Sequence, residues 1–262
     1  MDIKVLVATH KEYKMPEDNI YLPIQVGSEL SENYLGYQCD NVSENISHKN
    51  HNYSELTALY WGWKNLDCDY LGLVHYRRHF SLSKQKARSK EQIFDFILNS
   101  EEVNLLLAEN SAILPKKRNY VIETLHSHYS NTHNRRHLTL TESIIAKKFP
   151  DYLISYKKIL YQKKGHMFNM FIMKKDLSDK YCKWLFSILE ELEENIDESK
   201  LSSYDARLYG RISEILLNVW LDKQKVTCKE IEHLHLEKIN WFNKGMCFLR
   251  AKIFKKAYTE SF

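Results

Sequence analysis

Two arginines and two histidines follow directly on a short apolar run, in the stretch CDYLGLVHYRRHF. The run, residues 70–74, is followed by His75, Tyr76, Arg77, Arg78 and His79. A short apolar run bounded by polar residues is typical of a buried strand in an α/β sheet. Ligands of open α/β sheets bind just beyond the carboxyl ends of the strands, and a guanidinium group matches the geometry of phosphate. The stretch therefore predicts a phosphate-binding centre, with a solvated loop as the alternative.

Two further apolar runs also end in basic residues. Residues 3–8 are followed by Thr9, His10 and Lys11, and residues 112–115 are followed by Lys116, Lys117 and Arg118. Any one of these endings is typical of an ordinary surface turn. If the three predicted strands are parallel neighbours, their cations converge on one edge of the sheet and form an anion pocket.

Two acidic residues late in the chain are candidates for a general base. Asp205 and Glu214 lie in the predicted helix 202–220. A carboxylate that is to accept a proton from a hydroxyl must lie beside the reacting group, and most helical acids are only solvated. His166 and Asn169 are polar residues inside the otherwise apolar run 165–174, where a buried amide needs hydrogen-bond partners from the backbone or from a ligand.

The stretch 120–137 is rich in histidine. It carries His126, His128, His133 and His137, of which the last two are four residues apart and share one face of a helix. Neutral imidazole binds zinc. Because the stretch contains no HExxH motif and no cysteine, we do not predict a metal, and contacts with a sugar or an acceptor, or plain helix polarity, are the readings that we keep.

The elements that must position these residues alternate along the chain. Besides the three strands above, residues 165–174 are expected to form a buried strand. Apolar spacing predicts helices over residues 53–65, 93–98, 143–149, 152–160, 177–195 and 202–220, whereas residues 13–35 and 40–50 are expected to be irregular. This alternation predicts an α/β protein with a mostly parallel central sheet flanked by helices, followed by C-terminal helices.

Composition and charge narrow the class of protein. The chain has 262 residues, 44% of them apolar, a net charge of +4 and only 7 Gly and 4 Pro. The charge is too small to indicate a nucleic-acid binder, and we recognise no RRM, KH or helix-turn-helix motif. Five scattered cysteines without a CxxC pair fit reduced thiols in the cytoplasm. We see no signal peptide and no apolar stretch long enough for a transmembrane helix.

The C-terminal part differs from the rest. Residues 239–258 mix aromatic and basic side chains in a pattern that is typical of a basic amphipathic helix. Such a helix docks on its own domain or lies on an anionic membrane surface. We therefore predict one catalytic-size domain, residues 1–221, and a helical extension with a basic tail, residues 222–262.

Several long motifs resemble one bacterial family. They are DN-x3-NIS-x2-N (residues 40–50), ELTALYWGWKN (55–65), DYLGLVHYRRHF (69–80), LPKKRNY (114–120), GHMFNMFIMKK (165–175), YCKWLFSILEELE (181–193) and RLYGRISEILLNVWL (207–221). Together they resemble capsular and exopolysaccharide glycosyltransferases that were long described only as a domain of unknown function and include galactofuranosyltransferases. The resemblance spans residues 3–221 and does not cover the tail.

The resemblance implies a fold, a donor and an acceptor. The implied fold is GT-A-like and Rossmann-related. The implied reaction moves a sugar, galactofuranose as the first expectation, from a UDP-sugar to a lipid-linked oligosaccharide during synthesis of capsule or exopolysaccharide. The implied place is the cytoplasm, peripheral on the inner face of the cell membrane. The alternatives are a pyranosyl donor such as UDP-galactose or UDP-glucose, and a non-catalytic module of polysaccharide assembly.

The resemblance also implies which candidate residues act as the general base and which bind the nucleotide sugar. It implies that Glu214, Asp205 or, less favoured, His166 is the base of an inverting displacement. Uracil and ribose are expected near the end of the first strand, and the sugar is expected near Asn169. The nucleotide-sugar contacts that we expect are Thr9, His10, Lys11, Asn45, Asn50, His75, Tyr76, Arg77, Arg78, Lys116, Arg118 and Asn169.

The sequence departs from many GT-A enzymes at one place. These end the central strand with Asp-x-Asp, whose carboxylates hold a divalent cation, whereas this chain has His75-Tyr76-Arg77 there. A hard cation prefers oxygen ligands, and fixed positive charges can stabilise a leaving diphosphate in its place. We therefore predict transfer without a metal or other cofactor, with a divalent cation as the disfavoured alternative.

Overall fold

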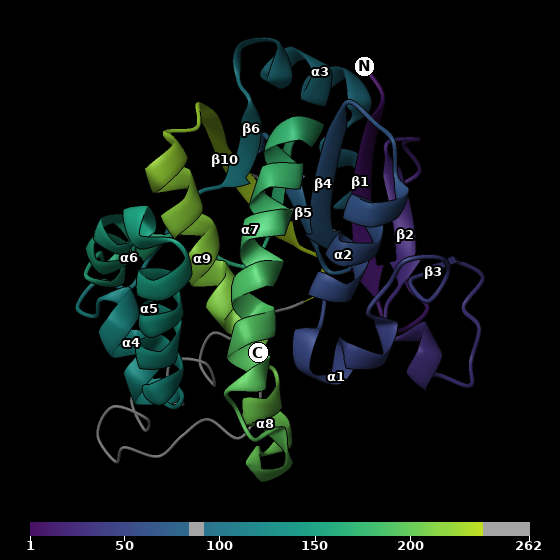
Figure 1. The fold of residues 1–262 in the computed structure, drawn as a ribbon. Helices are drawn as coiled ribbons and strands as arrows, with labels where there is room; N and C mark the ends of the chain where they lie inside the picture. Colours follow the sequence, from purple (N-terminus) through teal and green to yellow (C-terminus); the bar gives the residue numbers. More distant parts are fainter. Residues whose placement is uncertain (84–91, 238–262) are drawn as a thin grey trace.

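The computed structural model describes residues 1–83 and 92–237, and a mixed β-sheet forms its centre (Figure 1). The strands of this sheet are β1 (Ile3–Thr9), β2 (Tyr21–Gln25), β3 (Gln38–Cys39), β4 (Tyr70–His75), β5 (Arg78–Ser81), β6 (Ala112–Pro115), β9 (Phe171–Lys174) and β10 (Cys228–His235). A separate ribbon pairs β7 (Arg118–Asn119) with β8 (Lys164–Gly165). The strand order is β3-β2-β1-β4-β5-β10-β6-β9, and β9 also pairs with β4, so part of the sheet closes into a ring.

The strand directions place several ends at one edge of the sheet. β1 is parallel to β2 and β4, and β6 is parallel to β10. β9 is antiparallel to both β4 and β6, so β4 and β6 run in the same direction. The carboxyl ends of β1, β4, β6 and β10 therefore lie at the same edge, which we call the carboxyl edge, and β9 begins there. The expected convergence of the three basic strand ends is confirmed at the level of the backbone.

The sheet is not mostly parallel, contrary to the expectation from the sequence. β5 is antiparallel to β4 and β10, because the two residues Tyr76 and Arg77 form a tight turn that pairs His75 with Arg78. Two antiparallel strands need only such a short connection, whereas parallel strands need a long crossover. The residues expected as a polar loop after the strand are therefore partly a second strand, whose four residues are all buried.

Helices cover the sheet and build a second layer. They are α1 (Asn50–Tyr53), α2 (Leu56–Asn65), α3 (Ser100–Glu109), α4 (Leu125–Thr132), α5 (Arg136–Lys148), α6 (Leu153–Leu160), α7 (Lys175–Glu194), α8 (Ser203–Ala206) and α9 (Leu208–Gln224). Short 3-10 turns lie at Ser28–Leu30, Ser47–Lys49, Phe94–Phe96, Pro150–Tyr152 and Glu198–Lys200. In Figure 1, α7 crosses the sheet, and α4, α5 and α6 form a group beside α9.

The alternation of β1 supplies both faces of the sheet with apolar side chains. Leu6 and Ala8 join the core under α2, α7 and α9, whereas Val5 and Val7 join the core of the other face, which α3 covers. The predicted stripe of α7 is buried as expected, from Tyr181 to Leu192. Burying one large apolar side chain contributes roughly 1.5–3 kcal/mol, so this stripe is the main reason that α7 stays on the sheet.

Two predicted helices are interrupted. The predicted helix 53–65 is divided into α1 and α2 by Ser54, whose φ of 53° is incompatible with a helix. The predicted helix 202–220 is divided at Arg207 into α8 and α9. Both interruptions lie at the carboxyl edge, where the chain turns toward the polar residues described below.

The segment 13–35 is not only irregular, because β2 lies within it. Pro23 argued against a strand, since proline cannot donate a hydrogen bond to a neighbour. β2 pairs with β3 only at Ile24 and Gln25, so the missing N–H of Pro23 leaves no bond to β3 unmade. β2 is thus an inner strand that tolerates its proline.

The expected helical extension from residue 222 is wrong for residues 228–235. These residues form β10, which lies between β5 and β6 in the main sheet. Lys225, with φ 51° and ψ 44°, ends α9 in the left-handed conformation and returns the chain to the sheet. The predicted amphipathic tail, residues 239–258, lies outside the described residues. Within the described ranges, no helix is both long and apolar enough to cross a membrane.

Candidate active site

Glu214 is the carboxylate with the most unusual environment at the carboxyl edge. It lies on α9, and the backbone N–H of Phe168 donates to its Oε1 over 3.0 Å. Burial raises the pKa of Glu214 to about 7, and the nearby carboxylate of Glu55 also raises it, against the Phe168 N–H, Arg78 and Arg118, which lower it. A carboxylic acid with a pKa near neutrality can take up or release a proton under ordinary conditions.

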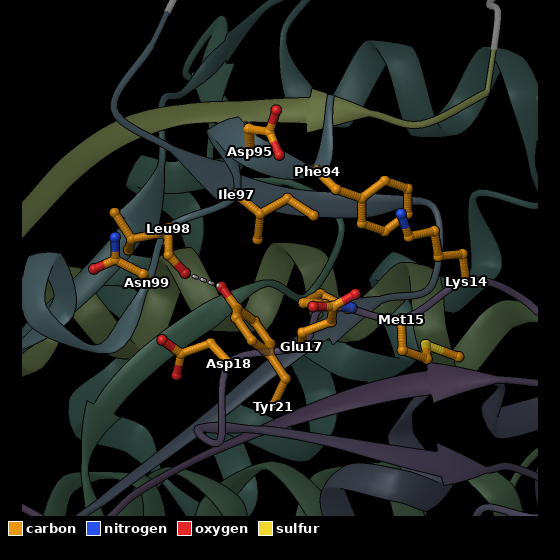
Figure 2. A pocket seen from close by; sticks show the side chains of 11 residues that line it. Lys14, Met15, Glu17, Asp18, Tyr21, Phe94, Asp95, Ile97, Leu98 and Asn99 are labelled. Carbon is orange, nitrogen blue, oxygen red and sulfur yellow. Dashed lines mark hydrogen bonds between the residues drawn. The ribbon is translucent and has the colours of Figure 1, made fainter. Parts of the chain in front are cut away.

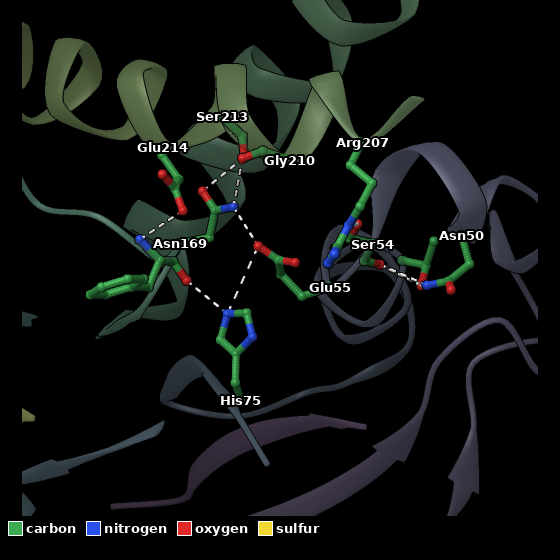
Figure 3. Close-up of polar contacts among 11 residues, drawn as sticks. Asn50, Ser54, Glu55, His75, Asn169, Arg207, Gly210, Ser213 and Glu214 are labelled. Carbon is green, nitrogen blue, oxygen red and sulfur yellow. Dashed lines mark hydrogen bonds and ion pairs between the residues drawn. The ribbon is translucent and has the colours of Figure 1, made fainter. Parts of the chain in front are cut away.

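Asn169 connects three elements around this carboxylate (Figure 3). Its Nδ2 donates to Glu55 Oε1 over 2.7 Å and to the carbonyl of Gly210 over 2.9 Å. Its Oδ1 accepts from the Ser213 hydroxyl over 2.7 Å. The buried amide, which the sequence marked as needing partners, is thus held by protein groups and fixes Glu55 against the start of α9.

His75 completes the polar centre from the end of β4. Its Nε2 lies 2.8 Å from the carbonyl of Phe168 and 3.8 Å from Glu55 Oε1. Because a carbonyl can only accept, we assign the proton to Nε2, which leaves Nδ1 as an acceptor in the neutral ring. Burial is the largest influence on His75 and lowers its pKa. We call Glu55, His75, Asn169, Ser213 and Glu214 the polar centre.

Unusual backbone conformations surround the polar centre. Phe168 and Asn169 have φ of 75° and 53°, and Ser54, immediately before Glu55, has φ of 53°. Positive φ is costly for residues other than glycine and persists where surrounding contacts enforce it. The Ser54 carbonyl accepts from Asn50 Nδ2, and the Ser54 hydroxyl accepts from Arg207 Nε. The strain therefore lies where side chains must be held in one place.

Arg78 is a buried cation next to this centre. Only 7% of the residue is exposed, and its guanidinium carbon lies 4.6 Å from the ring centroid of Phe168. Its Nε has no hydrogen-bond partner in the part of the chain that the structure describes. Burial, followed by the charge of Arg77, lowers the pKa of Arg78. A buried N–H without a partner is rare in folded proteins and is explained most simply by a ligand.

A second group of residues forms a more open surface beside the polar centre. We call His10, Lys11, Tyr13, Tyr76, Arg77 and Glu237 the cation–aromatic rim. Lys11 Nζ lies 3.3 Å from Glu237 Oε1, and Arg77 Nη1 lies 3.4 Å from Glu237 Oε2. Lys11 also lies 4.9 Å from the ring centroid of Tyr76. The first two strand ends are thus joined through an acid that follows β10.

The basic residues after β6 do not point toward the polar centre or the rim as a group. Lys116 Nζ pairs with Glu232 over 2.6 Å, and Lys117 Nζ lies 3.5 Å from Glu230, so both turn toward β10. The guanidinium carbon of Arg118 lies 4.7 Å from the ring centroid of Tyr120. The side chains of the three strand ends therefore do not form one pocket of cations, although Arg118 does lower the pKa of Glu214.

Four residues that were expected to contact the nucleotide, Thr9, His10, Asn45 and Asn50, each have different neighbours in the structure. The hydroxyl of Thr9 donates to the carbonyl of Lys11 and shapes the turn after β1, while His10 is exposed and packs edge-on against Tyr76. Asn50 supports Ser54, as described above. Asn45 closes a turn with Ser43 and Ser47.

Asn45 lies away from the polar centre. Its neighbour Glu44 accepts from Asn65 through the backbone carbonyl and pairs with Lys64, both in the last turn of α2. Glu55 precedes the first turn of the same helix, which is about 15 Å long at 1.5 Å per residue. Asn45 therefore lies near the opposite end of α2 from Glu55, and its contact with the nucleotide stays a prediction.

Asp205 and His166 also lie apart from Glu214's carboxylate. Asp205 caps α8 with Ser202, whose hydroxyl donates to Oδ2 over 2.7 Å. His166 Nδ1 lies 2.7 Å from the carbonyl of Pro115, and its backbone N–H donates to Asn218. Its Nε2 also lies 3.5 Å from Glu230 Oε1, so the described contacts of His166 join β6, α9 and β10, and burial lowers its pKa.

Sequence reasoning missed Glu55, Ser213 and Glu237. Glu55 was visible as the acid that begins the motif ELTALYWGWKN, directly before an expected helix. Ser213 precedes Glu214 and reads as an ordinary helical serine. Glu237 could be placed only with β10, which the pattern of residues 228–235 did not reveal.

A separate pocket of about 260 Å³ lies between the segment after β1 and the segment before α3 (Figure 2). Tyr21 crosses it and donates to the carbonyl of Leu98 over 2.6 Å. Its lining includes no residue of the polar centre or of the rim. Among residues 1–83 and 92–237, no group of three His, Cys, Asp or Glu side chains could hold a metal ion.

These features define an α/β protein with a buried carboxylate centre and a basic rim at the carboxyl edge. Its fold is similar to that of a solved structure, the apo form of the WbbM bifunctional glycosyltransferase, with a TM-score of 0.83 and 30% sequence identity. The match covers 91% of this chain and 46% of that one, so the chain spans about half the length of this relative. Comparison with curated proteins gives no match.

The chain belongs to the family DUF4422, a domain of unknown function, whose model matches residues 4–225. The resemblance inferred from the sequence, to a glycosyltransferase-related family of unknown function, is therefore confirmed. The match extends past α9 but ends before β10.

Proposed function

We propose that the protein is a glycosyltransferase that moves a sugar from a UDP-sugar to a hydroxyl group of a saccharide acceptor. The observation that carries the proposal is the carboxylate of Glu214, which burial holds at a pKa of about 7 beside the carboxyl edge. The similarity to a glycosyltransferase structure, at 30% identity over 91% of the chain, supports the same reaction class. The sheet order and its helical cover are consistent with a GT-A-like fold.

In the proposed reaction Glu214 acts as the general base. The acceptor hydroxyl attacks the anomeric carbon of the donor while the bond from this carbon to the β-phosphate oxygen breaks. The hydroxyl proton passes to Glu214, and the bonding electrons leave with UDP. Attack opposite to the leaving group inverts the anomeric configuration.

The leaving UDP is stabilised by fixed cations in this mechanism. Arg78 is supported in this role because its buried Nε has no partner, and Arg77 and Lys11 add charge at the neighbouring rim. Preorganised donors of this kind are effective in a site from which water is excluded. The β4 end offers His75, Tyr76 and Arg77 instead of paired carboxylates, so we propose that transfer does not require a metal.

The nucleotide is placed at the rim in this proposal. Tyr13 is a half-buried ring that packs edge-on against the buried ring of Tyr76 and is proposed to contact the base, and Lys11 and Arg77 lie beside these rings. We infer galactofuranose as the first donor sugar to test, and a lipid-linked oligosaccharide of capsule or exopolysaccharide synthesis as the acceptor. Peripheral contact with the inner face of the cell membrane in the cytoplasm belongs to the same proposal.

The test is a thermal-shift titration of the full chain with UDP, combined with an assay of donor hydrolysis. A ligand that binds only the folded state raises the melting temperature by mass action. We expect UDP to stabilise the protein equally in EDTA and in manganese, and UDP-galactofuranose to be consumed faster than UDP-galactose or UDP-glucose. Loss of both effects in EDTA would overturn the metal-free mechanism.

Arg78→Gln and Lys117→Gln form the matched pair for the phosphate site. We expect the first to weaken UDP binding at least tenfold, because hydrogen bonds to a charged group contribute about 1.5–3 kcal/mol. Lys117 pairs with Glu230 outside the polar centre, so its loss should leave UDP binding unchanged. A protein that binds no nucleotide and consumes no donor with or without acceptor would be a non-catalytic module.

A further inference from the structure

A second polar cluster lies where the end of α4 meets the start of α9. Arg211 Nη1 lies 3.2 Å from His133 Nδ1, and the guanidinium carbon of Arg211 lies 4.0 Å from the ring centroid of Tyr204. His133 in turn packs against Tyr129 and Tyr204, with ring centroids 4.9 Å and 5.3 Å away. We call Arg211, His133 and Tyr204 the α4–α9 corner.

The charge of Arg211 is not neutralised by an ion pair within the described residues. The acid whose charge influences it is Asp205, whose carboxylate accepts from the Ser202 hydroxyl and forms no ion pair with Arg211 among the described residues. Burial is the largest influence on Arg211 and lowers its pKa. A partly buried cation among neutral groups is unfavourable unless something compensates it, so the corner is suited to an anion.

His133 provides a second donor at the same place. Burial, followed by the charge of Arg211, lowers its pKa to about 2, so the ring is neutral at ordinary pH. Because Nδ1 accepts from Arg211, the proton of the neutral ring is on Nε2. The two tyrosine rings hold the imidazole in place, and the corner presents a guanidinium fork beside an imidazole N–H.

The corner and the candidate base share the first turns of α9. Glu214 follows Arg211 by three residues on α9, and residues three apart on a helix are neighbours with Cβ atoms about 5–6 Å apart. Arg207, one turn earlier, donates to Ser54 beside Glu55, and its charge lowers the pKa of His10 at the rim. The start of α9 therefore contributes to the polar centre and carries Arg211 of the corner, and Arg207, immediately before it, acts on the rim through its charge.

We propose that the α4–α9 corner binds an anionic group of the acceptor, a phosphate or a sugar carboxylate. This rests on the proposed function, which puts the nucleotide at the rim and the reacting hydroxyl at Glu214. In this proposal the acceptor approaches Glu214 along the start of α9, past Arg211 and His133. The corner would then fix the acceptor by its charge while Glu214 takes the proton.

The probes are inorganic phosphate, glucuronate and neutral methyl galactoside, each titrated into the full chain at constant ionic strength with saturating UDP. We expect one of the two anions, and not the neutral sugar, to raise the melting temperature of the native protein. The effective anion identifies phosphate or carboxylate as the group recognised. In Arg211→Gln the apparent affinity for the anion, taken from the titration, should fall at least tenfold. In Arg211→Lys it should fall less, because the positive charge remains although the guanidinium fork is lost.

Lys223→Gln is the matched control, since Lys223 lies over the ring of Tyr152 at the other end of α9. It should keep the native anion response. If Arg211→Gln does not fold, His133→Phe keeps the ring packing, removes the imidazole donor and should weaken the anion several-fold. The inference is overturned if no anion shifts the native protein, or if Arg211→Gln or His133→Phe responds like Lys223→Gln. Stabilisation by UDP, measured in the same samples without anion, reports on the proposed function separately.

Discussion

The polar centre and the cation–aromatic rim lie side by side at the carboxyl edge but are built in opposite ways. In the polar centre, Asn169 is tied to Glu55, Gly210 and Ser213; Asn169 and Ser213 are buried, and the side chains of His75 and Glu55 are only 16% and 11% exposed. At the rim, Lys11 and Arg77 share Glu237 at 3.3 and 3.4 Å, and their side chains remain 47% and 30% exposed. One region is held by buried hydrogen bonds, and the other by ion pairs that water and salt can reach.

The difference indicates a division of labour. A group that must exchange a proton benefits from burial, because desolvation moves the pKa of Glu214 toward neutrality. A surface that must capture and release a charged nucleotide benefits from exposure, because its ion pairs are exchanged for others at little cost. We therefore expect changes in the polar centre to affect turnover, and changes at the rim to affect donor binding in a salt-dependent manner.

The largest effect is expected for Glu214→Gln. Removing a general base typically costs 10²- to 10⁴-fold in rate, and glutamine keeps the size of the side chain. We expect kcat to fall at least 100-fold with UDP binding unchanged, as measured by initial rates and thermal shift. In the native protein kcat/KM should fall about tenfold per pH unit below the pKa of about 7, because protonated Glu214 cannot accept a proton.

Stability gives an independent check on the same carboxylate. Its pKa is raised from 4.5 to about 7, so the folded state binds more protons than the unfolded state between these values. The contribution of this group to stability is present below pH 4.5 and is lost as the pH rises through 7. Glu214→Gln should therefore melt at a higher temperature than the native protein at pH 8 and show no such gain at pH 4. If Glu214→Gln kept the kcat of the native protein, Glu214 would not be the general base.

Substitutions of Asn169 should have the next largest effect on kcat and on stability. The loss of stability has two parts, the lost hydrogen bonds and the backbone strain at a positive φ. Asn169→Ala removes the partners of Glu55 and Ser213 and keeps a Cβ at a φ of 53°. Asn169→Gly removes the same contacts without the Cβ, and a left-handed conformation costs other residues roughly 1–2 kcal/mol. We expect both to lose about 2–3 kcal/mol in urea unfolding and at least tenfold in kcat, with the alanine variant less stable by about 1 kcal/mol. Equal stability of the two would show that the backbone is not strained there.

The polar centre was only partly predictable from the sequence. The apolar runs predicted β1, β4 and β6, and the basic residues that follow them predicted the edge of the sheet at which these strands end. Asn169 was recognisable because a buried amide in an apolar strand needs partners, whereas Glu214 was one of two candidate acids on a predicted helix. The contact between Glu55 and Asn169 was not predictable, because the two are 114 residues apart, and no local pattern requires the positive φ of Ser54 and Asn169 that brings them together.

The rim shows the complementary limit. The THK and HYR endings pointed to it, but its acid Glu237 follows β10, and β10 was hidden in a polar stretch with few apolar residues. A strand of this kind is stabilised by its neighbours β5 and β6 rather than by its own pattern, and pairing of this kind is set by tertiary contacts. The same contacts turned Lys116 away, toward Glu232 on β10.

Glu237→Gln should give the smallest effect and the one most sensitive to salt. In the native protein Glu237 neutralises Lys11 and Arg77, so the donor diphosphate must compete with it for both cations. We expect the variant to bind UDP about three- to tenfold more tightly at low salt, and to match the native protein at 1 M salt, where the Debye length is about 3 Å. Glu230→Gln is the control, because Glu230 lies on β10 near Lys117 and His166, which are outside the rim, and its loss should leave UDP affinity unchanged. Weaker UDP binding by Glu237→Gln would instead make Glu237 a positioning residue for the two cations, and the rim would then resemble the polar centre in depending on a fixed geometry.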